Sequence, residues 1–348
     1  MEVKMKYQIT DALKAHFLRY RKMTPQDTVK LIYQSEFGPG HLITNENYAF
    51  ERLKTELENT VRDKSIPTVE AIGGDACRIN LASVPSELSV KTLTRIFMLS
   101  AEMFSGNANS FESKLSEVYS LIDEKYAPFS RHEYSEYLKK YFESGAGAVH
   151  HSLYYNALYR PAYRVVHASF VPLLPLLTEI DGKIAANERF TLKIDGRCGA
   201  GKSTLAETLR RIYGCGVVHA DDFYPSAGSD SPLDFERMAN EINDILSGKS
   251  DFYNAFDCSK QALTERISVD RVPFLTVEGS YSLHPRLKLD GISVFVTVSP
   301  ELQLKRLEKR SPDKLEAFKT RWIPAEERYF AEFGTAENCD FTVDTTAL

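Results

Sequence analysis

The feature that most constrains this chain is a glycine-rich segment between an apolar strand and a helix. Residues 190–195, FTLKID, have the apolar, β-branched character of a buried strand. They run directly into GRCGAGKS at 196–203, which fits G-x-x-x-x-G-K-[ST], and an amphipathic stretch follows at 204–213. In this context the pattern predicts a loop whose backbone N–H groups surround phosphates at a helix N-terminus. A chance match in a glycine-rich turn is the alternative.

The residue types in this loop suggest individual roles. Its glycines let backbone amides point inward, and we expect Lys202 to reach the β- and γ-phosphates of a nucleotide. The hydroxyl of Ser203 is the expected ligand of Mg²⁺, so the predicted cofactors are ATP and Mg²⁺. The residues expected to contact the nucleotide are Gly196, Gly199, Ala200, Gly201, Lys202, Ser203 and Thr204.

Beyond residue 189 the sequence alternates between apolar strands and helices, which is typical of a parallel sheet covered on both faces. The expected strands are 189–195, 217–220, 274–277, 292–298 and 340–343. The expected helices are 202–213, 234–246, 300–310 and 324–333. We therefore predict an α/β P-loop domain over 189–348.

The first half of the chain has helical spacing of its apolar residues. The expected helices are 8–21, 25–37, 46–60, 89–105, 109–125, 131–143 and 169–180, with short extended pieces at 77–82 and 163–166. The polar, turn-rich segment 181–188 marks a boundary. A mainly α-helical domain over 1–182 is predicted to precede the P-loop domain.

Two later strand ends carry carboxylates. VVHADDFY at 217–224 puts Asp221 and Asp222 at such an end, and FLTVEG at 274–279 does the same for Glu278. The carboxyl ends of parallel strands line the ligand crevice. Phosphoryl transfer to an alcohol needs a proton acceptor near magnesium, so Asp221 is the candidate base. Glu278 is the candidate second ligand of Mg²⁺. Solvated turn or strand-end residues are the alternative for both.

The helix expected at 300–310 carries Arg306 and Arg310 on one face, four residues apart. In a lid over the nucleotide, two such arginines would neutralise charge as the phosphoryl group moves. We therefore count them with Asp221 and Lys202 as catalytic candidates. A solvated basic stripe paired with acidic neighbours is the alternative.

The order GRCGAGKST, HADDFY, LDFERM, VEGSY and then an arginine-bearing helix resembles the uridine kinase, nicotinamide riboside kinase and phosphoribulokinase group of P-loop kinases. The resemblance covers about residues 189–348. It implies that Asp221 is the base, that Glu278 assists magnesium, and that Asp234 binds sugar hydroxyls of the acceptor. RWIP at 321–324 looks especially like the nicotinamide riboside kinases.

The acceptor side departs from the uridine kinases. NAFDCSK at 254–260 aligns through Phe256 and Asp257, but it lacks the histidine that follows in those enzymes. The resemblance therefore does not imply pyrimidine recognition, and the expected acceptor is a nucleoside or another ribose-bearing small molecule. The residues expected to bind it are Asp222, Tyr224, Asp234 and Asp257.

Composition narrows the classes of partner. A net charge of −5 gives no basic footprint for nucleic acid or an anionic membrane, so neither is expected as a partner. The five cysteines lack zinc-site spacing, and the N-terminus lacks a signal-peptide apolar stretch. We therefore expect a cytoplasmic protein with reduced thiols. A homodimer stays open.

The stretch 150–167 in the first half concentrates three histidines, four tyrosines and two arginines. It could line a pocket for an anionic or aromatic ligand. It could also bind a metal through His150 or His151, or pack as an interface against the C-terminal domain. Asp75, Cys77 and Arg78 could belong to the same pocket.

The leading interpretation is an ATP-dependent phosphotransferase that acts on a hydroxyl of a small molecule. The alternative is a nucleotide-controlled switch, in which the N-terminal half binds a ligand or a partner. Paired acids at strand ends and an arginine-bearing helix favour the enzyme.

Overall fold

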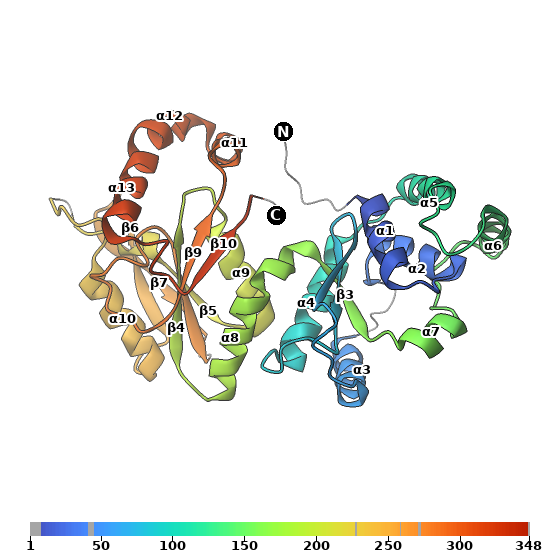
Figure 1. The fold of residues 1–348 in the computed structure, drawn as a ribbon. Coiled ribbons are helices and arrows are strands. Elements are labelled where there is room, and N and C mark those ends of the chain that lie inside the picture. Colours follow the sequence, from blue (N-terminus) through green and yellow to red (C-terminus); the bar gives the residue numbers. More distant parts are fainter. Residues whose placement is uncertain (1–7, 41–44, 227, 258, 271–272, 347–348) are drawn as a thin grey trace. The chain divides into compact units, whose positions relative to one another are not determined.

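The computed structural model describes residues 8–40, 45–226, 228–257, 259–270 and 273–346 (Figure 1). The chain divides into two compact units, with the division between Thr178 and Glu179. This division falls inside helix α8 (Leu174–Ala185). The segment 181–188, expected to be turn-rich, is therefore helical up to Ala185.

The N-terminal unit is mainly helical, as the sequence predicts, and it also holds a three-stranded antiparallel sheet in the order β1-β2-β3. Its helices are α1 (Ile9–Arg19), α2 (Pro25–Phe37), α3 (Glu46–Asn59), α4 (Val90–Met103), α5 (Ala108–Asp123), α6 (Arg131–Glu143), α7 (Leu153–Tyr159) and the 3-10 helix η2 (Ala168–Leu173). Its strands are β1 (Val69–Gly73), β2 (Ala76–Asn80) and β3 (Tyr163–His167). Strand β1 and helix α7 were not predicted, because five and seven residues are too few for a clear apolar period.

Helix α2 shows how local sequence starts an element in this unit. Thr24 is its N-cap, Pro25 occupies the first turn, and Thr24 and Asp27 form a capping box. Both features satisfy or remove backbone donors that a helix N-terminus leaves unpaired. The buried face of α2 then packs against α1, α5 and α6.

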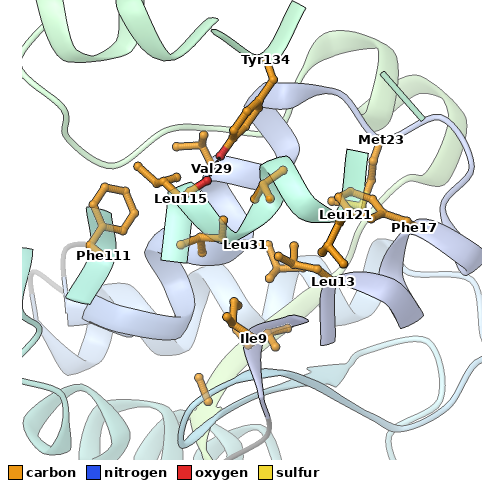
Figure 2. Close-up of a cluster of buried hydrophobic side chains, with 14 of the residues drawn as sticks. Ile9, Leu13, Phe17, Met23, Val29, Leu31, Phe111, Leu115, Leu121 and Tyr134 are labelled. Carbon is orange, nitrogen blue, oxygen red and sulfur yellow. Dashed lines mark hydrogen bonds between the residues drawn. The ribbon is translucent and has the colours of Figure 1, made fainter. Parts of the chain in front are cut away.

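The core of the N-terminal unit is an apolar cluster between these helices. Figure 2 shows Leu13 and Phe17 of α1 together with Leu31 of α2 and Leu121 of α5, and all four are essentially inaccessible to solvent. Burying side chains of this size stabilises a fold by about 1.5–3 kcal/mol each. The hydroxyl of Tyr134 donates to the Leu115 carbonyl at 3.0 Å, so this large ring is buried without an unpaired polar atom.

The C-terminal unit is built on a five-stranded parallel sheet flanked by helices, which confirms the predicted α/β fold class (Figure 1). The strand order is β10-β9-β4-β8-β5. The strands are β4 (Phe190–Gly196), β5 (Gly216–His219), β8 (Phe274–Glu278), β9 (Gly291–Thr297) and β10 (Phe341–Asp344). The helices are α9 (Lys202–Tyr213), η3 (Ala220–Phe223), α10 (Phe235–Ser247), α11 (Pro300–Arg310), η4 (Pro312–Lys314), α12 (Leu315–Ala317), the π-helix η5 (Phe318–Trp322) and α13 (Ile323–Phe333).

An antiparallel hairpin of β6 (Phe252–Asp257) and β7 (Ala262–Ser268) was not predicted. Most of β7 is exposed on both faces, so its sequence lacks the apolar alternation that marks a half-buried strand. In the described parts of the chain, no helix has the length and apolar character needed to cross a membrane.

Candidate active site

The carboxyl ends of three neighbouring strands position the phosphate loop, Glu278 and the residues that follow β5. Strand β4 leads into the phosphate loop, β8 ends at Glu278 and β5 ends at His219. The parallel register pairs Ile194 with Glu278 and Glu278 with His219. This is the edge at which open parallel sheets bind ligands.

The loop backbone depends on glycine at two positions. Gly196 has φ +134°, and a Cβ there would lie 2.0 Å from the carbonyl oxygen of Val296. Gly201 has φ +99° and is the N-cap of α9, yet no side chain caps that helix. A Cβ on Gly201 would meet nothing within 4 Å, so the helix start opens onto free space. Uncapped amides at a helix N-terminus suit an anion.

Lys202 lies across this loop. Its ammonium donates to the carbonyl oxygens of Gly196 at 2.6 Å and Arg197 at 3.3 Å. No carboxylate among the described residues forms a salt bridge with it, and its hydrogen bonds go to backbone oxygens of the loop.

Three other loop residues are tied to their surroundings in different ways. Ala200 is buried, and its carbonyl accepts from the Thr345 hydroxyl at 2.8 Å. The Gly199 carbonyl accepts from Arg306 at 3.4 Å. Thr204 is exposed in the first turn of α9.

A hydroxyl and a carboxylate meet beside the start of α9. Ser203 Oγ lies 3.1 Å from each oxygen of the buried Glu278 carboxylate. These hard oxygen donors are the kind that Mg²⁺ prefers, alongside phosphate oxygens and water. No group of three or more His, Cys, Asp or Glu residues in the described chain could hold a metal, so an ion here would need the phosphates as ligands.

His219 is a site residue whose role the sequence did not predict. Its Nδ1 lies 2.6 Å from Glu278 Oε1, and this hydrogen bond is the main cause of a raised pKa for His219. The charges of Glu278, Asp222 and Asp221 add to the shift. The raised pKa favours a positively charged His219 next to Glu278, the expected carboxylate ligand of Mg²⁺.

Asp221 follows β5 in the 3-10 helix η3, and its side chain reaches solvent. Partial burial of the carboxyl group raises its pKa, the charge of Glu278 raises it further, and Lys202 opposes the shift. Asp221 therefore lies in the electrostatic field of both Glu278 and Lys202.

Asp222 lies within η3, and Tyr224 directly follows the last residue of this helix. Asp222 Oδ2 accepts from the Tyr253 hydroxyl at 2.7 Å, whereas Tyr224 is 40% exposed. The two neighbouring acids thus differ, because the Asp222 carboxylate is held by the Tyr253 hydroxyl, whereas Asp221 is subject to the charge of Lys202.

Asp234 and Asp257, the other expected acceptor residues, both make local contacts. Asp234 caps α10 by accepting from the Arg237 amide at 3.1 Å. Asp257 closes the β6–β7 turn, where it accepts from both the amide and the hydroxyl of Ser259. These contacts, and those with Lys260, lower the pKa of Asp257 to about 2.

The two arginines of α11 have different surroundings. Arg306 donates to the Thr345 hydroxyl at 2.8 Å and to the Thr345 carbonyl at 3.0 Å, as well as to Gly199 of the loop. Arg310 is exposed at the helix end, 5.6 Å from the ring centroid of Phe318. Arg306 therefore braces the phosphate loop in this structure.

Two buried carboxylates accept hydrogen bonds from backbone amides of the phosphate loop. The sequence predicted neither role. Asp195 is fully buried and accepts from the Gly196 amide at 2.7 Å and the Tyr329 hydroxyl at 2.9 Å. Glu326 accepts from the Cys198 amide at 2.9 Å. Tyr329 and Glu326 both lie on α13, more than 120 residues away in sequence from the residues that they contact. No local motif could therefore reveal these contacts.

No family model matches the chain, and no curated protein matches it. Solved structures do resemble its C-terminal part. A possible uridine kinase from Bacillus stearothermophilus is 18% identical with a TM-score of 0.31, and the match covers 45% of this chain and 89% of that one. A protein described as a fructose transport system kinase from Silicibacter sp. TM1040 is 19% identical with a TM-score of 0.36, covering 44% and 89%. The YGR205w protein is 13% identical with a TM-score of 0.36, covering 52% and 94%.

These matches cover the same part of the chain as the resemblance that the motifs carry. At such identities and TM-scores they carry no conclusion about the activity of this chain. The chemistry of this chain has to be argued from its own residues.

Proposed function

We propose that the C-terminal unit is an ATP-dependent phosphotransferase that moves the γ-phosphate to a hydroxyl of a small molecule. The observation that carries this proposal is the meeting of Ser203 and Glu278, with 3.1 Å between hydroxyl and carboxylate, at the uncapped start of α9. An anion cradle beside a pair of magnesium-type ligands is what phosphoryl transfer requires.

Phosphate binding would fall to the loop amides and Lys202. When a nucleotide binds, the Lys202 ammonium would donate to phosphate oxygens in place of the backbone carbonyls, because charged oxygens are stronger acceptors. Ser203 and Glu278 would hold magnesium, which when bound neutralises charge on the β- and γ-phosphates.

Asp221 would accept the proton of the attacking hydroxyl. Its raised pKa makes it a better base than an ordinary aspartate, and the nearby positive charge of Lys202 keeps the ionised form accessible. Asp222, whose carboxylate already accepts from Tyr253, would instead shape the acceptor side.

The two arginines of α11 would act at different points. Arg306 is bonded to Gly199 and Thr345, which supports a role in holding the phosphate loop. Arg310, exposed at the end of the same helix, would be the one free to neutralise charge on the transferred group.

The acceptor is proposed to be a nucleoside or another ribose-bearing metabolite. Asp234 retains acceptor capacity after capping α10, since a carboxylate has about four lone-pair sites, and vicinal hydroxyls could use them. Asp257 is a weaker candidate, because its carboxylate is engaged by its own turn, and Tyr224 stays a candidate as an exposed ring after η3.

The test is ADP release by the full chain with Mg²⁺–ATP and a panel of nucleosides, vitamins and sugars. We expect at least one acceptor to stimulate release well above the rate with ATP alone, and the Lys202→Met variant to abolish the stimulation. A slow rate that no acceptor changes would count against a small-molecule kinase. Such a rate, together with nucleotide-dependent binding of a protein, would favour a switch in which the N-terminal unit is the sensor.

A further inference from the structure

The N-terminal unit contains a cavity of about 200 Å³ that the proposed phosphotransfer does not use. Helices α2, α3 and α4 contribute to its lining, and so do several residues of the stretch 150–167. The polar cluster seen in the sequence therefore lines a pocket within its own unit.

The charges that line this pocket do not balance. Lys30, Arg52 and Arg164 contribute three positive charges, and Glu56 is the single acidic lining residue. Glu56 is shared between two of them, at 3.2 Å from Arg52 and 2.5 Å from Arg164. A net positive charge therefore remains on the pocket wall.

Lys30 contributes one of the two positive charges that Glu56 does not balance. Its ammonium donates to the Val149 carbonyl at 3.2 Å, and no described carboxylate pairs with it. Burial, with the charge of Arg78 as the next cause, lowers the pKa of Lys30 to about 8. At neutral pH the side chain remains mostly protonated, so the fold keeps a poorly solvated cation.

A second cation lies behind the pocket wall. Arg78 is 2% exposed, no described carboxylate forms a salt bridge with it, and its Nε has no hydrogen-bond partner. Its Nη2 donates to Gln34, a lining residue, at 2.9 Å, and its guanidinium carbon lies 4.2 Å from the ring centroid of Tyr163. Buried charges without counter-ions are costly, and a site that binds an anion is a reason to keep them.

The polar wall of the pocket is fixed by hydrogen bonds that span the unit. His151 bonds through Nδ1 to Asp27 at 2.8 Å and through Nε2 to Tyr163 at 2.7 Å. Burial lowers the pKa of His151 to about 4 despite the bond to Asp27, so this ring adds no charge at neutral pH. Groups held this firmly lose little freedom when a ligand binds.

We propose that this pocket binds a small molecule through a doubly charged anionic group, a phosphoryl group or a pair of carboxylates, seated against Lys30 with Arg52 and Arg164 beside it. The anion would supply a directly paired counter-charge, which Lys30 and Arg78 lack among the described residues although the charges of Asp27 and Glu70 act on them. A metal site is not supported, because the described residues form no group of metal-binding side chains.

The test follows the reactivity of Lys30 itself, so that anion binding at the phosphate loop does not interfere. The full chain is labelled with trace acetic anhydride at about pH 8, where an amine of lowered pKa is reactive, and each lysine is quantified by peptide mass spectrometry. Sodium phosphate and sodium succinate are the probes, with sodium chloride at matched ionic strength as the control. Lys54, exposed on α3 outside the pocket, is the internal reference.

We expect a saturating anion to slow labelling of Lys30 by about fivefold or more and to leave Lys54 unchanged. Protection by phosphate alone identifies a phosphoryl site, protection by succinate alone a carboxylate site, and protection by both a general dianion site. Equal labelling of Lys30 in chloride and in both probes up to about 100 mM overturns the proposal, since a site with a millimolar Kd would then be filled.

A matched pair of variants checks that the pocket is responsible. Arg52→Gln removes a lining charge and should weaken the protection of Lys30 several-fold, whereas Lys54→Gln on the same helix should not. Both positions are exposed, so neither change should disturb folding. Equal protection in the two variants would contradict the assignment of Arg52 to the site.

Discussion

Lys202 and Lys30, which belong to different units of the chain, make similar contacts, but only Lys202 was identified from the sequence. Each donates to backbone carbonyls, and neither forms a salt bridge with a described carboxylate. The partners of Lys202 lie five and six residues away, within one motif. Lys30 is bonded to a carbonyl 119 residues away. We infer an anion site at each lysine, although a sequence motif accompanies only Lys202.

The largest expected effect is that of Asp221→Asn on the C-terminal site. Loss of the proton acceptor should reduce acceptor-stimulated turnover about 100- to 10,000-fold, while ATP affinity changes little. Turnover by coupled ADP release and affinity by nucleotide titration separate the two. Asp230→Asn, an exposed change in the following loop, is the control. Unchanged turnover in Asp221→Asn would remove this residue from the base role.

A smaller effect, on the Mg²⁺ requirement of turnover, is expected from Glu278→Gln. The neutral amide keeps its size but weakens the magnesium site, so the Mg²⁺ concentration for half-maximal turnover should rise about 10- to 100-fold. Titration of Mg²⁺ at fixed ATP measures it. An unchanged Mg²⁺ requirement would show that Glu278 serves only to hold Ser203 and His219.

In the N-terminal unit, Lys30→Met should increase the stability of the fold. Removing a poorly solvated cation is expected to raise the free energy of unfolding of the ligand-free unit by about 1–3 kcal/mol. Hydrogen exchange of core amides such as Leu121 measures it. A destabilised variant would mean that the Lys30 charge supports the fold.

The same lysine predicts a pH dependence. Because its pKa is lowered from 10.5 to about 8 by folding, the unfolded chain binds more protons between these values, and stability should rise with pH across that window. In Lys30→Met this rise should be absent. Hydrogen exchange or denaturant titration from pH 8 upward compares the two proteins, and parallel curves would contradict the assigned shift.

The smallest effect concerns His219. While its raised pKa keeps it protonated, the imidazolium competes with Mg²⁺ for Glu278, so Mg²⁺ affinity should rise by a few-fold as pH rises through that pKa. The contribution of the His219–Glu278 bond to stability has the opposite trend, present below pH 6.5 and lost above the folded pKa. In His219→Asn the step in Mg²⁺ affinity should disappear.

Sequence reasoning recovered the C-terminal sheet well because its signals are local. The strands and the helices next to Gly196 and Lys202 follow from apolar runs, glycines and caps within a few residues. The hairpin β6–β7 was missed because an exposed strand has no apolar pattern to read. The residues that support the loop, Asp195 and Glu326, make contacts with residues 134 and 128 positions away, respectively.

The N-terminal unit shows the limit more clearly. The stretch 150–167 stood out by composition, but its sequence favoured a packing interface over a ligand pocket, and a metal site lacked a supporting spacing. Its contacts with Asp27 and Gln34 join residues 124 and 129 positions apart, and these contacts turn a polar segment into a pocket wall. Cys77 and Arg78 both lie in the buried strand β2. Arg78 donates a hydrogen bond to Gln34 of the pocket wall, whereas no contact of Cys77 with the wall is described.

The most direct test of the phosphotransferase account is the fate of the γ-phosphorus of ATP, followed by ³¹P NMR with the full chain, Mg²⁺ and an acceptor that stimulates ADP release. The account predicts a new phosphomonoester resonance that grows in step with ADP and is lost in Asp221→Asn. Inorganic phosphate as the sole phosphorus product, formed at the same rate with every acceptor, would contradict it.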